Sequence, residues 1–66
     1  MPNRADIELA TTIRGYREIA ETLRDLAART RFAGRAARWL REAEDWEQRA
    51  EVLHDALTRP REGINA

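Results

Sequence analysis

Two regularly spaced sets of apolar and small residues run along the chain. In each set the step between neighbours alternates between three and four residues, which is the heptad spacing of helices that pack along a seam. The first set is Leu9, Ile13, Tyr16, Ala20, Leu23 and Ala27, and the second is Ala36, Trp39, Ala43, Trp46, Ala50, Leu53 and Leu57. The pattern therefore predicts two amphipathic helices and an all-α fold.

Further apolar residues widen both seams. Thr12, Ile19 and Leu26 run along one flank of the first seam, and Leu40 lies beside the second. A stripe wider than one seam is typical of a helix that packs against more than one neighbour.

The two seams are out of register with each other. One heptad beyond Ala27 lies Gly34, whereas the second seam places its equivalent position at Ala36. A continuous helix would point the two stripes in different directions, and Gly34 can adopt the left-handed conformation that often closes a helix. We therefore predict a single domain, residues 1–66, folded as an antiparallel helical hairpin. It has a helix at about 4–30, a turn at about 31–35, a helix at about 36–58 and a tail at 59–66.

Local signals support these boundaries. Asn3 is a suitable N-cap residue, and Asp6 and Glu8 place negative charge in the first turns of the helix. Thr58 and Arg59 precede Pro60, which disfavours helical backbone in the residue before it.

The sequence also predicts two ion pairs within the helices and a role for the glycine in the first helix. We expect i, i+4 ion pairs between Asp25 and Arg29 and between Asp45 and Arg49. Gly15 costs about 1 kcal/mol relative to alanine inside a helix, and we expect it to permit a close helix approach, under a tryptophan from the second helix or from a partner.

The chain is short for a hairpin that must fold alone. It has 66 residues and no cysteine, which excludes disulfides and thiolate zinc sites as stabilising cross-links. A partner chain is the remaining means of stabilisation, and two hairpins with short loops suit a four-helix bundle. We therefore predict a homodimeric bundle of coiled-coil type. The residues expected to carry self-association are Ile19, Leu26, Trp39, Leu40, Trp46 and Leu53.

Charge is balanced overall but unevenly distributed. The formal net charge is zero, so no overall field attracts the chain to nucleic acid or to an anionic membrane. Residues 29–41 carry five arginines and no acid, whereas residues 42–55 are mainly acidic. Two hairpins with their turns at opposite ends would bring unlike charges together.

No apolar run approaches the length of a membrane span, and the N-terminus lacks the apolar core of a secretory signal. We expect a cytoplasmic protein.

Glu51 and His54 have the Glu-x-x-His spacing of carboxylate metal sites in helical bundles, and Glu18 is level with them in an antiparallel hairpin. The positions of Glu18 and Glu51 relative to the seams direct both side chains toward solvent. We therefore expect a histidine at the edge of the helix interface and no metal or other cofactor, and the metal site is the third hypothesis for function.

The second hypothesis for function is the binding of nucleic acid or another anion. It rests on an arginine-rich stretch with interleaved aromatic residues, a combination that can bind such ligands. Its candidate residues are Arg29, Arg31, Arg35, Arg38 and Arg41, with Phe32 and Trp39 among them. Trp39 lies one heptad from Trp46, which places both indoles in the helix seam instead. The sequence contains no nucleophile elbow, phosphate loop or paired buried carboxylates. We therefore favour a non-enzymatic structural or protein-interaction module.

Three segments carry a resemblance to other proteins. They are YREIAETLRDLA at residues 16–27, ARWLREA at 37–43 and DWEQRAEVL at 45–53. The chain resembles small uncharacterised alphaproteobacterial proteins that have an arginine- and alanine-rich first helix, a short turn and a second helix. The resemblance implies a helical hairpin and a bacterial cytosolic setting, and it implies no activity.

Overall fold

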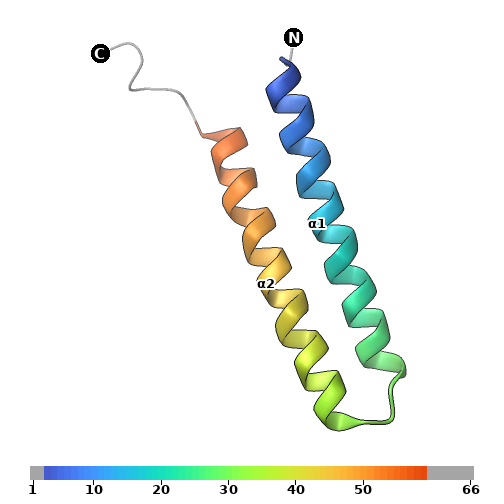
Figure 1. Ribbon diagram of the computed structural model, residues 1–66. Helices are drawn as coiled ribbons and strands as arrows, with labels where there is room; N and C mark the ends of the chain where they lie inside the picture. Colours follow the sequence, from blue (N-terminus) through green and yellow to red (C-terminus); the bar gives the residue numbers. More distant parts are fainter. Residues whose placement is uncertain (1–2, 60–66) are drawn as a thin grey trace.

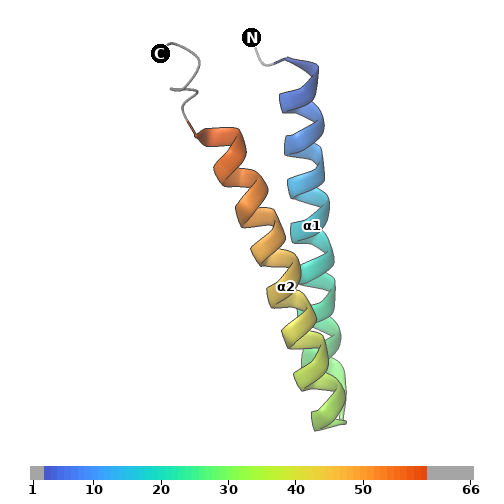
Figure 2. The same cartoon turned by 60° about the vertical axis from the view of Figure 1, so that its left-hand side comes forward.

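A computed structural model describes residues 3–59 as two helices, α1 (Arg4–Arg29) and α2 (Ala33–Thr58). The helices lie side by side, run in opposite directions and are joined by residues 30–32 (Figures 1 and 2). No strand occurs in the described part of the chain. The predictions of an all-α fold and a helical hairpin are confirmed.

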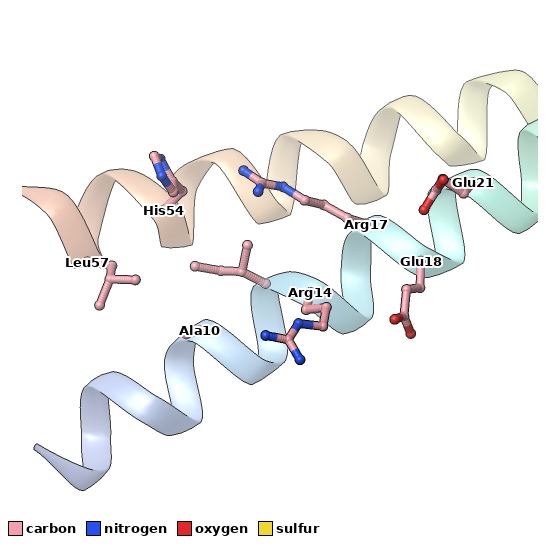
Figure 3. Close-up of a pocket in the computed structure, with 8 residues that line it drawn as sticks. Ala10, Arg14, Arg17, Glu18, Glu21, His54 and Leu57 are labelled. Carbon is pink, nitrogen blue, oxygen red and sulfur yellow. The ribbon is translucent and has the colours of Figure 1, made fainter. Parts of the chain in front are cut away.

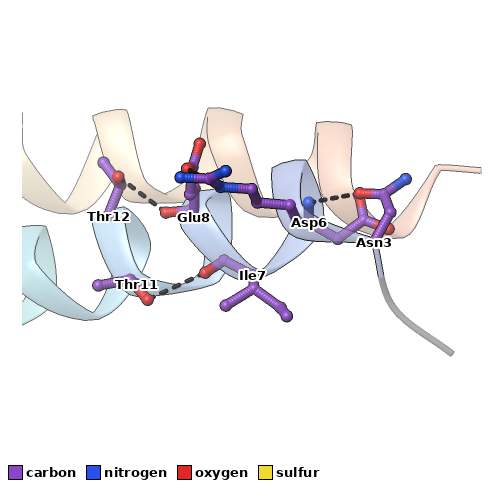
Figure 4. Close-up of polar contacts among 7 residues, drawn as sticks. Asn3, Asp6, Ile7, Glu8, Thr11 and Thr12 are labelled. Atoms are coloured by element: carbon purple, nitrogen blue, oxygen red, sulfur yellow. Dashed lines mark hydrogen bonds and ion pairs between the residues drawn. The ribbon is translucent and has the colours of Figure 1, made fainter.

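The start of α1 is fixed by the predicted cap. The backbone N–H of Asp6 donates a hydrogen bond to Oδ1 of Asn3 at 2.8 Å (Figure 4). This bond satisfies one of the amides that a helix leaves unpaired at its first turn. The side chain of Asp6 adds negative charge at the positive end of the helix dipole.

The turn is shorter than the sequence predicted. Helix α2 begins at Ala33, three residues before the expected start, and Gly34 lies in its first turn without a positive φ. The chain reverses instead through extended backbone at Thr30 and Phe32. The Phe32 backbone N–H donates to Oγ1 of Thr30 at 3.2 Å, which supports the reversal. No left-handed residue is needed, and that expectation for Gly34 is wrong.

Replacing Gly34 with alanine should therefore stabilise the protein. An added Cβ would meet no atom within 4 Å, and alanine loses less backbone freedom than glycine in a helix. We expect the free energy of unfolding of Gly34→Ala to rise by about 0.5 kcal/mol in urea denaturation. A loss of stability would instead indicate the left-handed turn that the sequence suggested.

The two predicted seams face each other across the hairpin. Every member of both seams is buried or half-buried. The buried residues are Ile13, Ala20, Ala27, Ala43 and Ala50. Four of these five are alanines, so the helices pack closely, and the larger seam residues lie at the edges of the contact with part of their surface in solvent. Among the described residues, no large side chain is fully buried.

The end of α2, the role of Gly15 and the absence of a membrane span were also predicted from the sequence. α2 ends at Thr58 as predicted, and residues 60–66 of the expected tail lie outside the described part. A Cβ at Gly15 would meet nothing within 4 Å, so Gly15 does not admit a tryptophan of α2. Neither described helix combines the length and apolar character needed to cross a membrane.

Candidate functional site

A bidentate ion pair joins the two helices on one side of the hairpin. Nε of Arg24 donates to Oε2 of Glu47 at 3.2 Å, and Nη2 of Arg24 donates to Oε1. Each residue directly follows a seam residue, Leu23 in α1 and Trp46 in α2. In an antiparallel pair of helices, positions that follow the seam lie together on one side and positions that precede it lie on the other. The sequence analysis missed this pair because its identification requires the register of the hairpin, which depends on the length of the turn.

The ion pair favours the charged form of both partners. The hydrogen bonds from Arg24, together with its positive charge, hold the pKa of the Glu47 carboxyl below its usual value. The bonds to Glu47 likewise raise the pKa of the Arg24 guanidinium. Since the lowered carboxyl pKa belongs to the folded state, the stability from this pair is present above the unfolded pKa of glutamate. It is lost as pH falls through the lower, folded pKa.

Replacing Arg24 with glutamine should therefore raise the pKa of Glu47 toward its usual value. The measurement is an NMR titration of the Glu47 side-chain carboxyl carbon in both proteins between pH 2 and 7. Added salt should narrow the difference between them, because both side chains are almost half exposed. An identical titration midpoint in the two proteins would show that the ion pair does not persist in solution.

The side chains predicted to carry self-association fall into two groups. Trp39, Trp46 and Leu53 are half-buried in the seam between α1 and α2. Ile19 and Leu26 precede seam residues and lie exposed on one flank, whereas Leu40 follows a seam residue and lies exposed on the side of the Arg24–Glu47 pair. The surface open to a partner is thus divided between two sides of the hairpin.

Trp46 lies at the centre of an aromatic contact between the helices. Its ring centroid is 5.1 Å from that of Tyr16, with the ring planes inclined at 58°. The guanidinium carbon of Arg49 lies 4.7 Å from the centroid of the Trp46 ring, a cation–π arrangement. Arg49 is therefore directed to the indole, and its expected ion pair with Asp45 does not form. The expected pair of Asp25 and Arg29 does form, at 3.2 Å.

An open groove lies between the helices near the free ends of the chain. It has a volume of about 390 Å³, and Figure 3 shows its lining side chains. The residues that line it are Ala10, Ile13, Arg14, Arg17, Glu18, Glu21, His54 and Leu57. Two arginines and two glutamates lie around its apolar residues, so the groove has no preference for a ligand of one charge.

The candidate metal ligands do not converge in this groove. Glu51, His54 and Asp55 each offer one donor atom within 4.8 Å of the others, and all three come from a single turn of α2. Asp55 was not identified from the sequence. Glu18 lines the groove from α1, but its carboxylate points away from His54 (Figure 3). The facing-helix ligand that a carboxylate bundle site requires is not in place.

The arginine-rich end is exposed and unevenly paired. Arg29 pairs with Asp25, and the guanidinium carbon of Arg35 lies 5.2 Å from the Phe32 ring centroid. The remaining candidates, Arg31, Arg38 and Arg41, have no ion-pair partner in the described part of the chain. Trp39 is half-buried in the seam, so Phe32 is the aromatic side chain that this end presents to solvent.

Comparison with known proteins does not assign the chain to a family. No protein-family model, no curated protein and no solved structure matches it.

Proposed function

We propose that this hairpin is a non-enzymatic structural or protein-interaction module of the bacterial cytoplasm that self-associates as a homodimer. The observation that supports this most directly is the composition of the interior. The buried residues are four alanines and one isoleucine, while Ile19, Leu26 and Leu40 remain exposed. A single pair of helices is one layer, and domains usually bury their apolar faces between two layers. A second hairpin would supply the missing layer as a four-helix bundle.

The charge distribution favours one relative orientation of the two hairpins. The arginine-rich end surrounds the turn, and the acidic residues follow it along α2 toward the free ends. Hairpins with their turns at opposite ends place the basic part of one chain alongside the acidic part of the other. Hairpins with their turns together place arginines against arginines.

Molecular mass in solution tests this proposal. Light scattering coupled to size exclusion should give a mass near twice the 7.6 kDa of the chain at micromolar concentration. A folded, helical species of 7.6 kDa across the accessible concentration range would contradict it.

A second candidate function is the binding of nucleic acid or another polyanion at the arginine-rich end. It is favoured by Arg31, Arg38 and Arg41, which have no ion-pair partner within residues 3–59, and by the exposed Phe32 near them. Binding to single-stranded RNA, measured by fluorescence anisotropy, should then be strongest at low salt and weaken steeply as salt is added. Absence of binding at the lowest salt at which the protein stays soluble would exclude this function.

A further inference from the structure

Helix α1 carries a second seam beside the one that packs on α2, and its members are exposed or half-buried. Thr12, Gly15, Ile19, Thr22 and Leu26 are spaced by alternating steps of three and four residues. Each of them directly precedes a member of the seam that packs on α2, so the second seam is rotated by about 100° around the helix. Two seams at about a right angle are typical of a helix with two neighbours in a four-helix bundle.

The polar groups of this second seam are already satisfied. The Thr12 hydroxyl donates to the backbone carbonyl of Glu8 at 3.0 Å (Figure 4), and the Thr22 hydroxyl donates to that of Glu18 at 3.0 Å. With these hydrogens occupied, the two threonines can be buried against a partner without leaving an unpaired donor. A shallow hollow on this face, where a partner side chain can enter, is lined by Gly15, Ile19 and Thr22 of the second seam together with Glu18 and Leu23.

The second seam is distinguished from its neighbours by its lack of charge. The residues that follow the α1 seam include Arg14, Arg17 and Arg24. Both stripes that flank the α2 seam also contain several charged residues. From Thr12 to Leu26 the second seam of α1 contains no charged residue. Continuing its spacing by one step at each end gives Glu8 before it and Arg29 after it. The seam thus has one negative end and one positive end.

We propose that this surface binds the same surface of a second copy, with the two α1 helices antiparallel about a two-fold axis near Ile19. The inference rests on the proposed self-association and names its interface. Residues 8 and 29, 12 and 26, and 15 and 22 are all symmetric about residues 18–19. Antiparallel pairing therefore sets Glu8 beside Arg29 of the other copy at both ends. Between them, larger side chains meet smaller ones: Leu26 meets Thr12, and Thr22 meets Gly15.

Parallel pairing of the same seams would lack this complementarity. It would place Glu8 beside Glu8 and Arg29 beside Arg29, which repels at both ends. In the single chain these residues form only exposed pairs, Glu8 with Arg4 at 3.3 Å and Arg29 with Asp25 at 3.2 Å. Such pairs are weak and leave both side chains available to a partner.

A matched pair of substitutions tests the location of the interface. Ile19 and Leu40 are 39% and 40% exposed and lie on opposite sides of the hairpin. Ile19→Arg should raise the dimer Kd at least about 100-fold, because it places two like charges near the axis and removes apolar contact. Leu40→Arg should leave the Kd within about threefold of its original value. Sedimentation equilibrium gives both values, with circular dichroism as the check on helicity.

Charge reversal tests the ends of the seam. Arg29→Glu should weaken the dimer about tenfold, because two attractive contacts become repulsive. Adding Glu8→Arg in the same chain restores opposite charges and should return most of the lost affinity. A purely local effect of Arg29 on its own helix would not be rescued from position 8.

Cross-linking keeps the test informative if an arginine variant unfolds. The chain has no cysteine, so Ile19→Cys introduces a single thiol close to the proposed axis. Mild oxidation should convert it to a covalent dimer, while Arg29→Cys should not cross-link, because its two copies would lie about 30 Å apart. Efficient cross-linking at position 29 would overturn the antiparallel arrangement.

A dimer unaffected by Ile19→Arg but lost in Leu40→Arg would overturn this interface while leaving self-association intact. A monomeric wild-type protein would overturn self-association itself.

Discussion

Trp46→Ala should destabilise the protein by about 3 kcal/mol and dissociate the proposed dimer. The indole contacts Tyr16 across the hairpin and lies under the guanidinium of Arg49. Its removal leaves a gap in the contact between the helices. Urea denaturation followed by circular dichroism measures the loss of stability.

Phe32→Ala is the matched control for this substitution. It also removes an aromatic side chain, but Phe32 is 62% exposed at the N-cap of α2 and makes no side-chain capping bond. We expect its effect on the free energy of unfolding to stay within about 0.5 kcal/mol. Equal effects at the two positions would show that Trp46 does not form part of the helix interface.

Ala43→Leu should also be destabilising, although it adds apolar volume. Ala43 is completely buried, and close packing of the helices around it leaves no room for a larger side chain. Leucine would push the helices apart at a cost of about 1–3 kcal/mol. The free energy of unfolding from urea denaturation is the relevant measurement.

Ala37→Leu provides the comparison for that change. Residue 37 is on the same helix but is exposed, so the substitution leaves the helix interface untouched. We expect little change, within about 0.5 kcal/mol, because leucine and alanine are both good helix formers. If Ala43→Leu proved as stable as Ala37→Leu, the close alanine contact would be contradicted.

The helices and their contact faces could be predicted from the sequence because they depend on local periodicity. Each seam combines alanines with larger apolar residues at heptad spacing, and all of these positions lie in the helix contact. The cap at Asn3 was predictable for the same reason, since its hydrogen bond reaches only to Asp6. The end of α2 at Thr58 likewise follows from the neighbouring proline.

Features that depend on the geometry of the turn could not be predicted in this way. Glycine is compatible with both a left-handed turn and the first turn of a helix, so Gly34 alone did not locate the reversal. The pairing of Arg24 with Glu47 depends on the register that the short turn creates. Arg49 had two possible partners, and the choice of Trp46 over Asp45 depends on side-chain geometry that spacing does not specify.

The proposed self-association rests on a feature of the sequence, because the second seam of α1 has the periodicity of a contact face and its residues are exposed or half-buried in the single chain. In such a dimer, the contacts between the two chains also contribute to the stability of the fold. Variants that weaken the dimer should unfold more readily at low protein concentration, because dissociation and unfolding are coupled in small obligate dimers.

The most direct test of this account is urea denaturation at two protein concentrations that differ by 100-fold. If unfolding is coupled to dissociation of a dimer, the transition should move to higher urea at the higher concentration, equivalent to about 2.7 kcal/mol of apparent stability. Superimposable transitions from a fully helical protein would show that one hairpin is stable alone, and would contradict the account.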